Sequence, residues 1–197
     1  MDIGIFDLET SGFFADSSIL LCCSIKENKI NGVKTIRADH FKSWDKEKTN
    51  EKEMIQAVAN ELDKFDILIA HNEERFDKKY FNAKCIQYGI RPILRFKKVV
   101  DPIQLSWRHL RLGRNSLAAL IDYLEIPVKK TPIELNKWLK AALNGDRKCM
   151  DLICTHCEHD ILTLEQVYKK LKLLVDKIDT KIEMTGQNDP DQRNKWI

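Results

Sequence analysis

The chain has 197 residues and a mass of 23.0 kDa, which fits one domain of moderate size that can bury a core without disulfides. Hydrophobic residues make up 43% and charged residues 32%, and Lys+Arg 33 against Asp+Glu 30 gives a net charge of +3. These values exclude collagen, coiled coils and small disulfide scaffolds, and the charge alone does not demonstrate a nucleic-acid partner. We expect neither a signal peptide nor a membrane span, and hence a cytoplasmic protein with reduced cysteines.

The first forty residues are typical of a three-stranded antiparallel meander. We expect strands over 2–10, 19–25 and 30–36, because apolar residues alternate in the first and run continuously in the second, and the third follows a polar turn. A helix is predicted to begin near Asn50, with Glu53 placed to complete a capping box. The short apolar run 67–70 then predicts a central strand.

The second half of the chain is mostly helical in its pattern. Val99 and Val100 form a last short strand, and Asp101 is the expected N-cap before Pro102. Helices are predicted over 73–88, 102–112, 116–125, 133–143 and 146–175. This order indicates an α/β fold with a mixed central sheet, an antiparallel meander plus parallel strands, flanked by helices. We assign residues 1–176 to one domain and 177–197 to a mobile C-terminal tail.

Three short segments carry most of the candidate chemistry, and the first is the acidic pair near the N-terminus. Asp7 and Glu9 are two residues apart on a predicted strand, so both carboxylates project from one face. Adjacent carboxylates repel each other and are costly to desolvate. A divalent cation between them would explain the pair, and so would the polar face of a half-exposed strand.

The other two segments also admit more than one interpretation. Asp77 follows the central strand, where ligand-binding groups collect, but an acid in the first turn of a helix also complements the helix dipole. His156 and Asp160 are i,i+4 neighbours on the last helix, able to act on one site or to form an exposed pair of little consequence. His159 is expected on the solvent side. Cys154 and Cys157 form a CxxC, but no second pair accompanies it, so we do not favour a zinc site.

Taken together, the three segments resemble the DEDD exonucleases of the DnaQ-like branch of the ribonuclease H fold. The resemblance spans roughly residues 2–175, and the stretch with Trp138, Gly145-Asp146 and His156 is most similar to YprB-type ribonuclease H-like domains. It implies a ribonuclease H-like fold and a metal-dependent 3′–5′ exonuclease that releases nucleoside 5′-monophosphates from nucleic-acid 3′ ends. It also implies two Mg²⁺ or Mn²⁺ ions, hard cations that prefer oxygen ligands, held by Asp7, Glu9, Asp77 and Asp160.

The chain departs from the family at the fifth site residue. The family has Tyr four positions before the last Asp, or His five positions before it, whereas this chain has His156 at four and Thr155 at five. We assign His156 the role of general base or water-orienting group, because imidazole is a competent base near neutral pH.

Substrate contacts are predicted in two places. The resemblance implies that Thr10, Ser11 and Gly12 line the pocket of the terminal nucleotide and that Asn72 orients the site or touches substrate. Basic residues recur every third position around Trp107, and they can grip the phosphates of single-stranded DNA or RNA or form a solvated helix face; they are Arg108, Arg111 and Arg114. Two alternatives to an exonuclease remain: a catalytically weak or inactive nucleic-acid-binding module with the same fold, and a nuclease that cuts internally or processes structured substrates.

Overall fold

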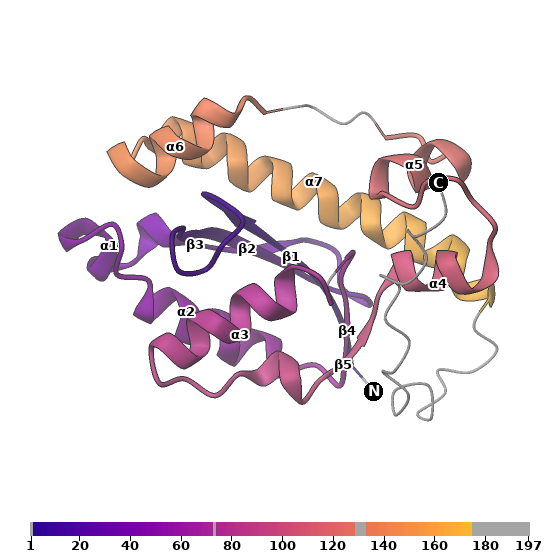
Figure 1. Ribbon diagram of the computed structural model, residues 1–197, viewed down its shortest axis with the longest axis horizontal. Helices are drawn as coiled ribbons and strands as arrows, with labels where there is room; N and C mark the ends of the chain where they lie inside the picture. Colours follow the sequence, from indigo (N-terminus) through magenta and orange to yellow (C-terminus); the bar gives the residue numbers. More distant parts are fainter. Residues whose placement is uncertain (1, 73, 129–132, 175–197) are drawn as a thin grey trace, which may run out of the picture.

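A computed structural model describes residues 2–72, 74–128 and 133–174, and the predicted tail 177–197 lies outside these ranges (Figure 1). Its centre is a five-stranded sheet in the order β3-β2-β1-β4-β5. The strands are β1 (Ile3–Thr10), β2 (Leu20–Glu27), β3 (Lys34–Arg37), β4 (Ile67–Ile69) and β5 (Lys98–Val100). β1 pairs antiparallel with β2, and β2 with β3, whereas β1 pairs parallel with β4, and β4 with β5. The mixed sheet predicted from the sequence is therefore confirmed.

Helices cover both faces of this sheet. They are α1 (Lys42–Lys46), α2 (Lys52–Leu62), α3 (Asp77–Gln87), α4 (Pro102–His109), α5 (Leu117–Tyr123), α6 (Leu135–Asn144) and α7 (Arg147–Leu171). Three short 3-10 turns complete the described elements: η1 (Ala38–His40), η2 (Ile93–Arg95) and η3 (Lys172–Leu174). Figure 1 shows α6 and the long α7 above the sheet, and α2 and α3 below it. Within the described residues, no helix has the length and apolar character of a membrane span.

The alternation of side chains along β1 decides which face the candidate site occupies. Phe6 and Leu8 belong to the main core cluster, which includes residues of α2 and α3. Ile5 lies on the other face, in a cluster with Ile161 and Leu164 of α7. Because side chains two positions apart share a face of a strand, Asp7 and Glu9 follow Ile5 and face α7.

Two predictions for the first part of the chain were wrong in detail. The third strand begins at Lys34, not at residue 30, because Ile30 is exposed and Gly32 adopts a φ of 111°, which forms a turn. The capping box at Asn50 does not form. The Glu53 carboxylate instead accepts hydrogen bonds from the backbone N–H and hydroxyl of Ser43, at 3.2 Å and 3.0 Å.

The helices that are shorter than their sequence pattern predicts include α3 and α4. α3 begins at Asp77, because Asn72 has a φ of 62° and Phe76 is not helical. α4 ends at His109, because Leu110 is extended, which places Arg111 and Arg114 beyond the helix. The start of α4 agrees with the prediction: the Asp101 carboxylate accepts a hydrogen bond from Ile103 N at 2.9 Å, and Pro102 is the first helical residue.

Candidate active site

The first part of the site is the contact between Asp7 and α7. The Cys157 thiol donates to the backbone oxygen and to the Oδ2 atom of Asp7, both at 3.5 Å. Burial raises the pKa of Cys157 to about 12, and the negative charges of Asp7 and Glu9 act in the same direction. The thiol therefore stays protonated at neutral pH and serves as a donor that holds Asp7 against the helix.

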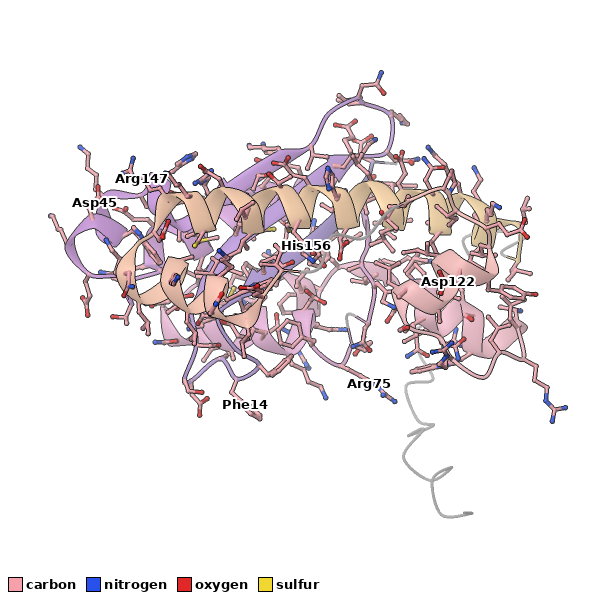
Figure 2. All side chains as sticks on the ribbon, turned by 90° about the horizontal axis from the view of Figure 1, so that it is seen from above. Phe14, Asp45, Arg75, Asp122, Arg147 and His156 are labelled. Atoms are coloured by element: carbon pink, nitrogen blue, oxygen red, sulfur yellow. The ribbon has the colours of Figure 1, made fainter. Side chains whose placement is uncertain are left out.

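His156 links the second carboxylate of β1 to the acid of α7. Its Nε2 atom lies 3.8 Å from Glu9 Oε1 and 3.8 Å from Asp160 Oδ2. The three side chains keep 16–19% of their surface exposed, so solvent reaches them. Figure 2 shows His156 near the middle of α7. His159 is exposed, as predicted.

Trp138 of α6 is a further member of this group. Its indole N–H donates to Glu9 Oε2 at 3.2 Å, and its ring meets that of His156 edge-to-face, with centroids 6.2 Å apart and planes at 86°. Glu9 is thus held from two sides, by α6 and by α7. Trp138 lies next to its Oε2 atom and His156 next to its Oε1 atom.

Asp77 is the most deeply buried of the four predicted carboxylates, with 4% of its surface exposed. It occupies the first turn of α3, where the N–H groups of a helix stabilise a negative charge. Burial raises the pKa of Cys23, and the negative charges of Asp7 and Asp77 act in the same direction. Asp7 and Asp77 therefore both lie within electrostatic range of one buried thiol.

The carboxylate oxygens of these residues are the ligand type that Mg²⁺ and Mn²⁺ prefer. Their chemistry suits a metal ion, but the part of the chain that the structure describes does not bring them together as a complete set of ligands. Among the described residues, no group of three or more His, Cys, Asp or Glu side chains is placed to hold a metal ion. Glu9 and Asp160 each lie 3.8 Å from His156 Nε2. The four-carboxylate metal site therefore stays a prediction.

Comparison with known proteins identifies the family of the chain. A family model described as RNase_H superfamily matches residues 5–172. The chain belongs to the RNase H superfamily. A search of curated proteins found no match to it. Among solved structures, the chain is similar to the family B DNA polymerase from the hyperthermophilic archaeon Pyrobaculum calidifontis, with a TM-score of 0.61 and 12% identity.

That similarity covers 86% of this chain but only 24% of the polymerase chain. At this identity it supports the fold alone. The family match and the structural similarity agree on the architecture, so the ribonuclease H-like fold predicted from the sequence is confirmed.

In this RNase H superfamily domain, the predicted nucleotide-pocket residues shape a loop. The Thr10 hydroxyl donates to Gly12 O at 2.7 Å, and Ser11 Oγ accepts from Ile19 N at 3.0 Å. The same loop exposes two aromatic rings, Phe13 by 83% and Phe14 by 72%. Both side-chain oxygens are thus hydrogen-bonded within the loop.

The other predicted substrate residues separate into two groups. Asn72 and Arg114 line one cavity of about 440 Å³, together with Trp107. Arg108 is exposed on α4 and Arg111 is exposed beyond its end, and neither lines this cavity. Arg108 and Arg111 therefore do not share a cavity with Arg114, and their contact with substrate stays a prediction.

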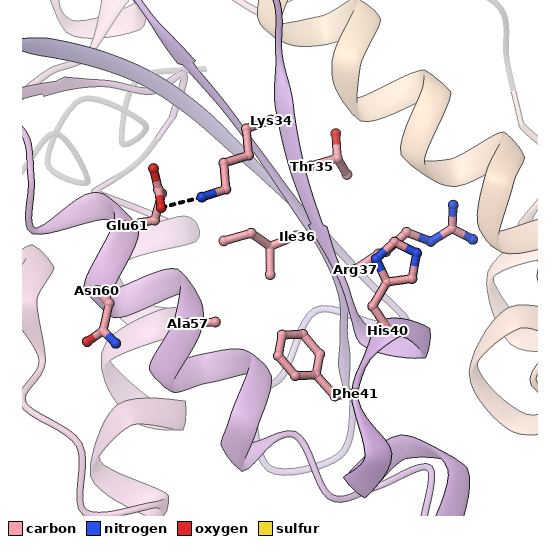
Figure 3. Close-up of a pocket in the computed structure, with 9 residues that line it drawn as sticks. All are labelled: Lys34, Thr35, Ile36, Arg37, His40, Phe41, Ala57, Asn60 and Glu61. Carbon is pink, nitrogen blue, oxygen red and sulfur yellow. Dashed lines mark hydrogen bonds and ion pairs between the residues drawn. The ribbon is translucent and has the colours of Figure 1, made fainter.

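Three residues near the site were not predicted to act there. Trp138 and Cys157 contact Glu9 and Asp7 across 129 and 150 residues of sequence, and no local spacing signals such contacts. Arg75 lies in the loop before α3 and lines the same cavity as Trp107. A second cavity, of about 350 Å³, lies between β3 and α2 beside the Lys34–Glu61 ion pair, and no predicted site residue lines it (Figure 3).

Proposed function

We propose that this chain is a metal-dependent 3′–5′ exonuclease of the DEDD type, acting on the 3′ ends of single-stranded DNA or RNA. The observation that carries the proposal is the group formed by Glu9 of β1 with His156 and Asp160 of α7, beside Asp7 on the same strand face. Membership of the RNase H superfamily supports a nuclease, and the partly exposed position of the group gives a strand access to it.

Each residue has a defined task in this proposal. Asp7, Glu9, Asp77 and Asp160 would hold two Mg²⁺ or Mn²⁺ ions, which supply water activation and stabilisation of the leaving 3′ oxygen. His156 would accept a proton at Nε2 and orient the attacking water, because Nε2 is the atom that faces both carboxylates. Trp138 would fix the direction of the Glu9 carboxylate through its N–H.

A second candidate is a nucleic-acid-binding module that does not hydrolyse its ligand. The specific observation in its favour is that Trp138 already donates a hydrogen bond to Glu9 and that His156 lies beside the same carboxylate. This candidate predicts binding of a strand with no cleavage.

Hydrolysis of 5′-labelled single-stranded DNA and RNA, in Mn²⁺, in Mg²⁺ and in EDTA, separates the two candidates. We expect a ladder that shortens from the 3′ end, lost in EDTA and lost in Asp7→Ala. The Asp7→Ala protein should keep its fold, because the substitution shortens a partly buried polar side chain and leaves the buried apolar residues of β1 in place. Internal fragments from the wild type would instead indicate an internally cutting nuclease, and no cleavage with retained binding would favour the module.

A further inference from the structure

The cavity between the loop before α3, α4 and the start of α5 is built from side chains that suit a nucleotide. Its volume is about 440 Å³. An aromatic ring, two guanidinium groups and several neutral polar groups line it: Trp107, Arg75, Arg114, His71, Asn72 and Asn115. A base offers a flat face to an aromatic ring and a phosphate offers charge to arginine, so the lining matches both halves of a nucleotide.

The walls of the cavity are fastened to one another by hydrogen bonds. One Asp101 oxygen accepts from Asn72 N at 3.0 Å and from Ile103 N at 2.9 Å, which ties the loop before α3 to the start of α4. The buried Ser106 hydroxyl donates to Asn115 Oδ1, which ties the segment before α5 to the middle of α4. The cavity is therefore formed before any ligand arrives.

Inside the cavity, the Arg75 guanidinium lies over the Trp107 ring, 5.0 Å from its centroid. Arg75 is exposed and Trp107 is half-buried; Figure 2 shows Arg75 at the edge of the molecule. Stacking of a base on an aromatic ring is stronger than an exposed cation–π contact. A base can therefore take the place of Arg75 on the indole, and the displaced guanidinium can bind the adjoining phosphate together with Arg114.

We propose that this cavity holds one nucleotide of the single-stranded substrate away from the cleaved bond, with its base on Trp107 and its phosphate on Arg75 and Arg114. The inference rests on the proposed function for its substrate. The link to the active site is that Asn72 and Arg75, which line the cavity, lie shortly before Asp77 at the start of α3. A strand bound at the cavity would thus be aligned with the carboxylates.

The test measures binding without hydrolysis. The probes are fluorescein-labelled oligo(dT) and oligo(U), titrated by fluorescence anisotropy in EDTA so that the strand stays intact. We expect Trp107→Ala to weaken the affinity by about tenfold, from the loss of one base stack. Trp107→Phe keeps an aromatic face and should recover most of the affinity. Arg114→Ala should weaken binding and lower the slope of log K against log salt by about 0.7.

The chain supplies a matched control in a second exposed arginine–aromatic pair. The Arg91 guanidinium lies 4.9 Å from the centroid of the Phe96 ring, and neither residue lines the cavity. Arg91→Ala removes the same charge as Arg114→Ala, and Phe96→Ala removes an exposed ring, so both should bind the probes as the wild type does. Because Arg114 is exposed, its variant tests the cavity even if Trp107→Ala unfolds.

Two results would overturn the proposal: equal affinity of the Arg114 and Arg91 variants, or displacement of the oligonucleotide by thymidine monophosphate as effectively as by unlabelled oligo(dT). The latter would show a mononucleotide pocket, not a strand subsite. The binding experiment tests the nucleotide cavity independently of the cleavage experiment, which tests the proposed nuclease activity. Absence of cleavage in Mn²⁺ with the expected binding losses refutes only the nuclease, whereas cleavage with equal binding of all variants refutes only the subsite.

Discussion

The Glu9 carboxylate is the residue on which the contacts of the candidate site converge. Trp138 donates to one of its oxygens at 3.2 Å, and His156 lies 3.8 Å from the other. The hydrogen bond from Trp138 restricts the rotation of this carboxylate before it binds anything. Its orientation therefore depends on two helices, and substitutions in either helix should be felt at the site.

Variants of the two histidines of α7 test whether His156 acts in the site while His159 is only a surface residue. His156→Ala should lower the hydrolysis rate by about 10²–10⁴-fold, because it removes a proton acceptor placed between Glu9 and Asp160. His159→Ala should be nearly neutral, since His159 is exposed on the other side of the helix. Single-turnover rates of both variants check this. A larger loss in the His159 variant would mean that the reacting face of α7 is the opposite one.

Trp138→Phe isolates the hydrogen bond to Glu9. The phenyl ring keeps the packing against His156 but lacks the N–H, so the hydrolysis rate should fall by about tenfold, as expected for one bond to a charged group. The control is Trp44→Phe, at a buried tryptophan of α1. Equal rates for the two variants would show that the N–H has no part in the reaction.

At the scale of elements, a buried ion pair joins α2 and α3 to the start of β2. Lys84 Nζ donates to Glu51 Oε2 at 2.5 Å and to Ser18 O at 2.6 Å, and Glu51 also accepts from Leu20 N at 2.5 Å. The two side chains are 3% and 0% exposed. Burial, the largest effect, raises the pKa of Glu51, and the hydrogen bonds from Lys84 and Leu20 oppose it. An unpaired charge in this buried position would therefore destabilise the folded protein.

Removing one partner should therefore be far worse than breaking a surface pair. We expect Lys84→Met to destabilise the protein by about 3–5 kcal/mol, because it leaves a buried carboxylate uncompensated. The comparison is Lys34→Met, which breaks the Lys34–Glu61 pair, whose lysine is 59% exposed. That variant should lose less than about 1 kcal/mol. Chemical denaturation of both gives the two values, and similar losses would contradict the assigned role of burial.

Particular elements show how far the sequence carries. Local sequence patterns predict three features that the structure confirms. They are the alternation along β1, the apolar run of β2 and the start of α4 at Asp101–Pro102. The end of α4 is not predicted in this way, because Leu110 continues the apolar pattern while its backbone is extended. Likewise, Glu53 has a spacing that suits a capping box, but Ser43 is a competing partner from another helix. The tertiary contact with Ser43 explains the second case.

The same distinction holds for the site. The face shared by Asp7 and Glu9, and the neighbourhood of His156 and Asp160, follow from the periods of a strand and a helix. The contacts of Trp138 with Glu9 and of Cys157 with Asp7 join distant segments. No periodicity within either segment encodes them, so only the folded structure reveals them.

At the scale of the whole molecule, α7 is fastened to the sheet by a buried charge cluster as well as by apolar contacts. Glu165 of α7 lies 3.1 Å from the ammonium of Lys26 on β2 and 3.0 Å from that of Lys169. Burial acts to raise the pKa of Glu165, but the hydrogen bonds from Lys169 and Lys26 outweigh it and hold the pKa below its usual value.

This cluster predicts a specific acid sensitivity. A carboxyl group with a lowered pKa in the folded state adds stability above its unfolded pKa, about 4.3, and that stability is lost as the pH falls through the folded pKa. Glu165→Gln should thus lower the thermal midpoint at neutral pH and flatten its decline below about pH 4. The control is Glu74→Gln, at an exposed pair with Lys78. An unchanged acid profile in the Glu165 variant would remove this explanation.

The separation of Asp7 and Cys157 by 150 residues has a consequence for biosynthesis. β1 is translated before β2 and α7 and can pair with β2 as soon as that strand emerges, but the face that carries Asp7 and Glu9 stays uncovered until α7 has been translated. A nascent chain thus holds its acidic strand without the helix that supplies His156 and Asp160. In the proposed function, activity would therefore require α7 to be translated and packed against β1.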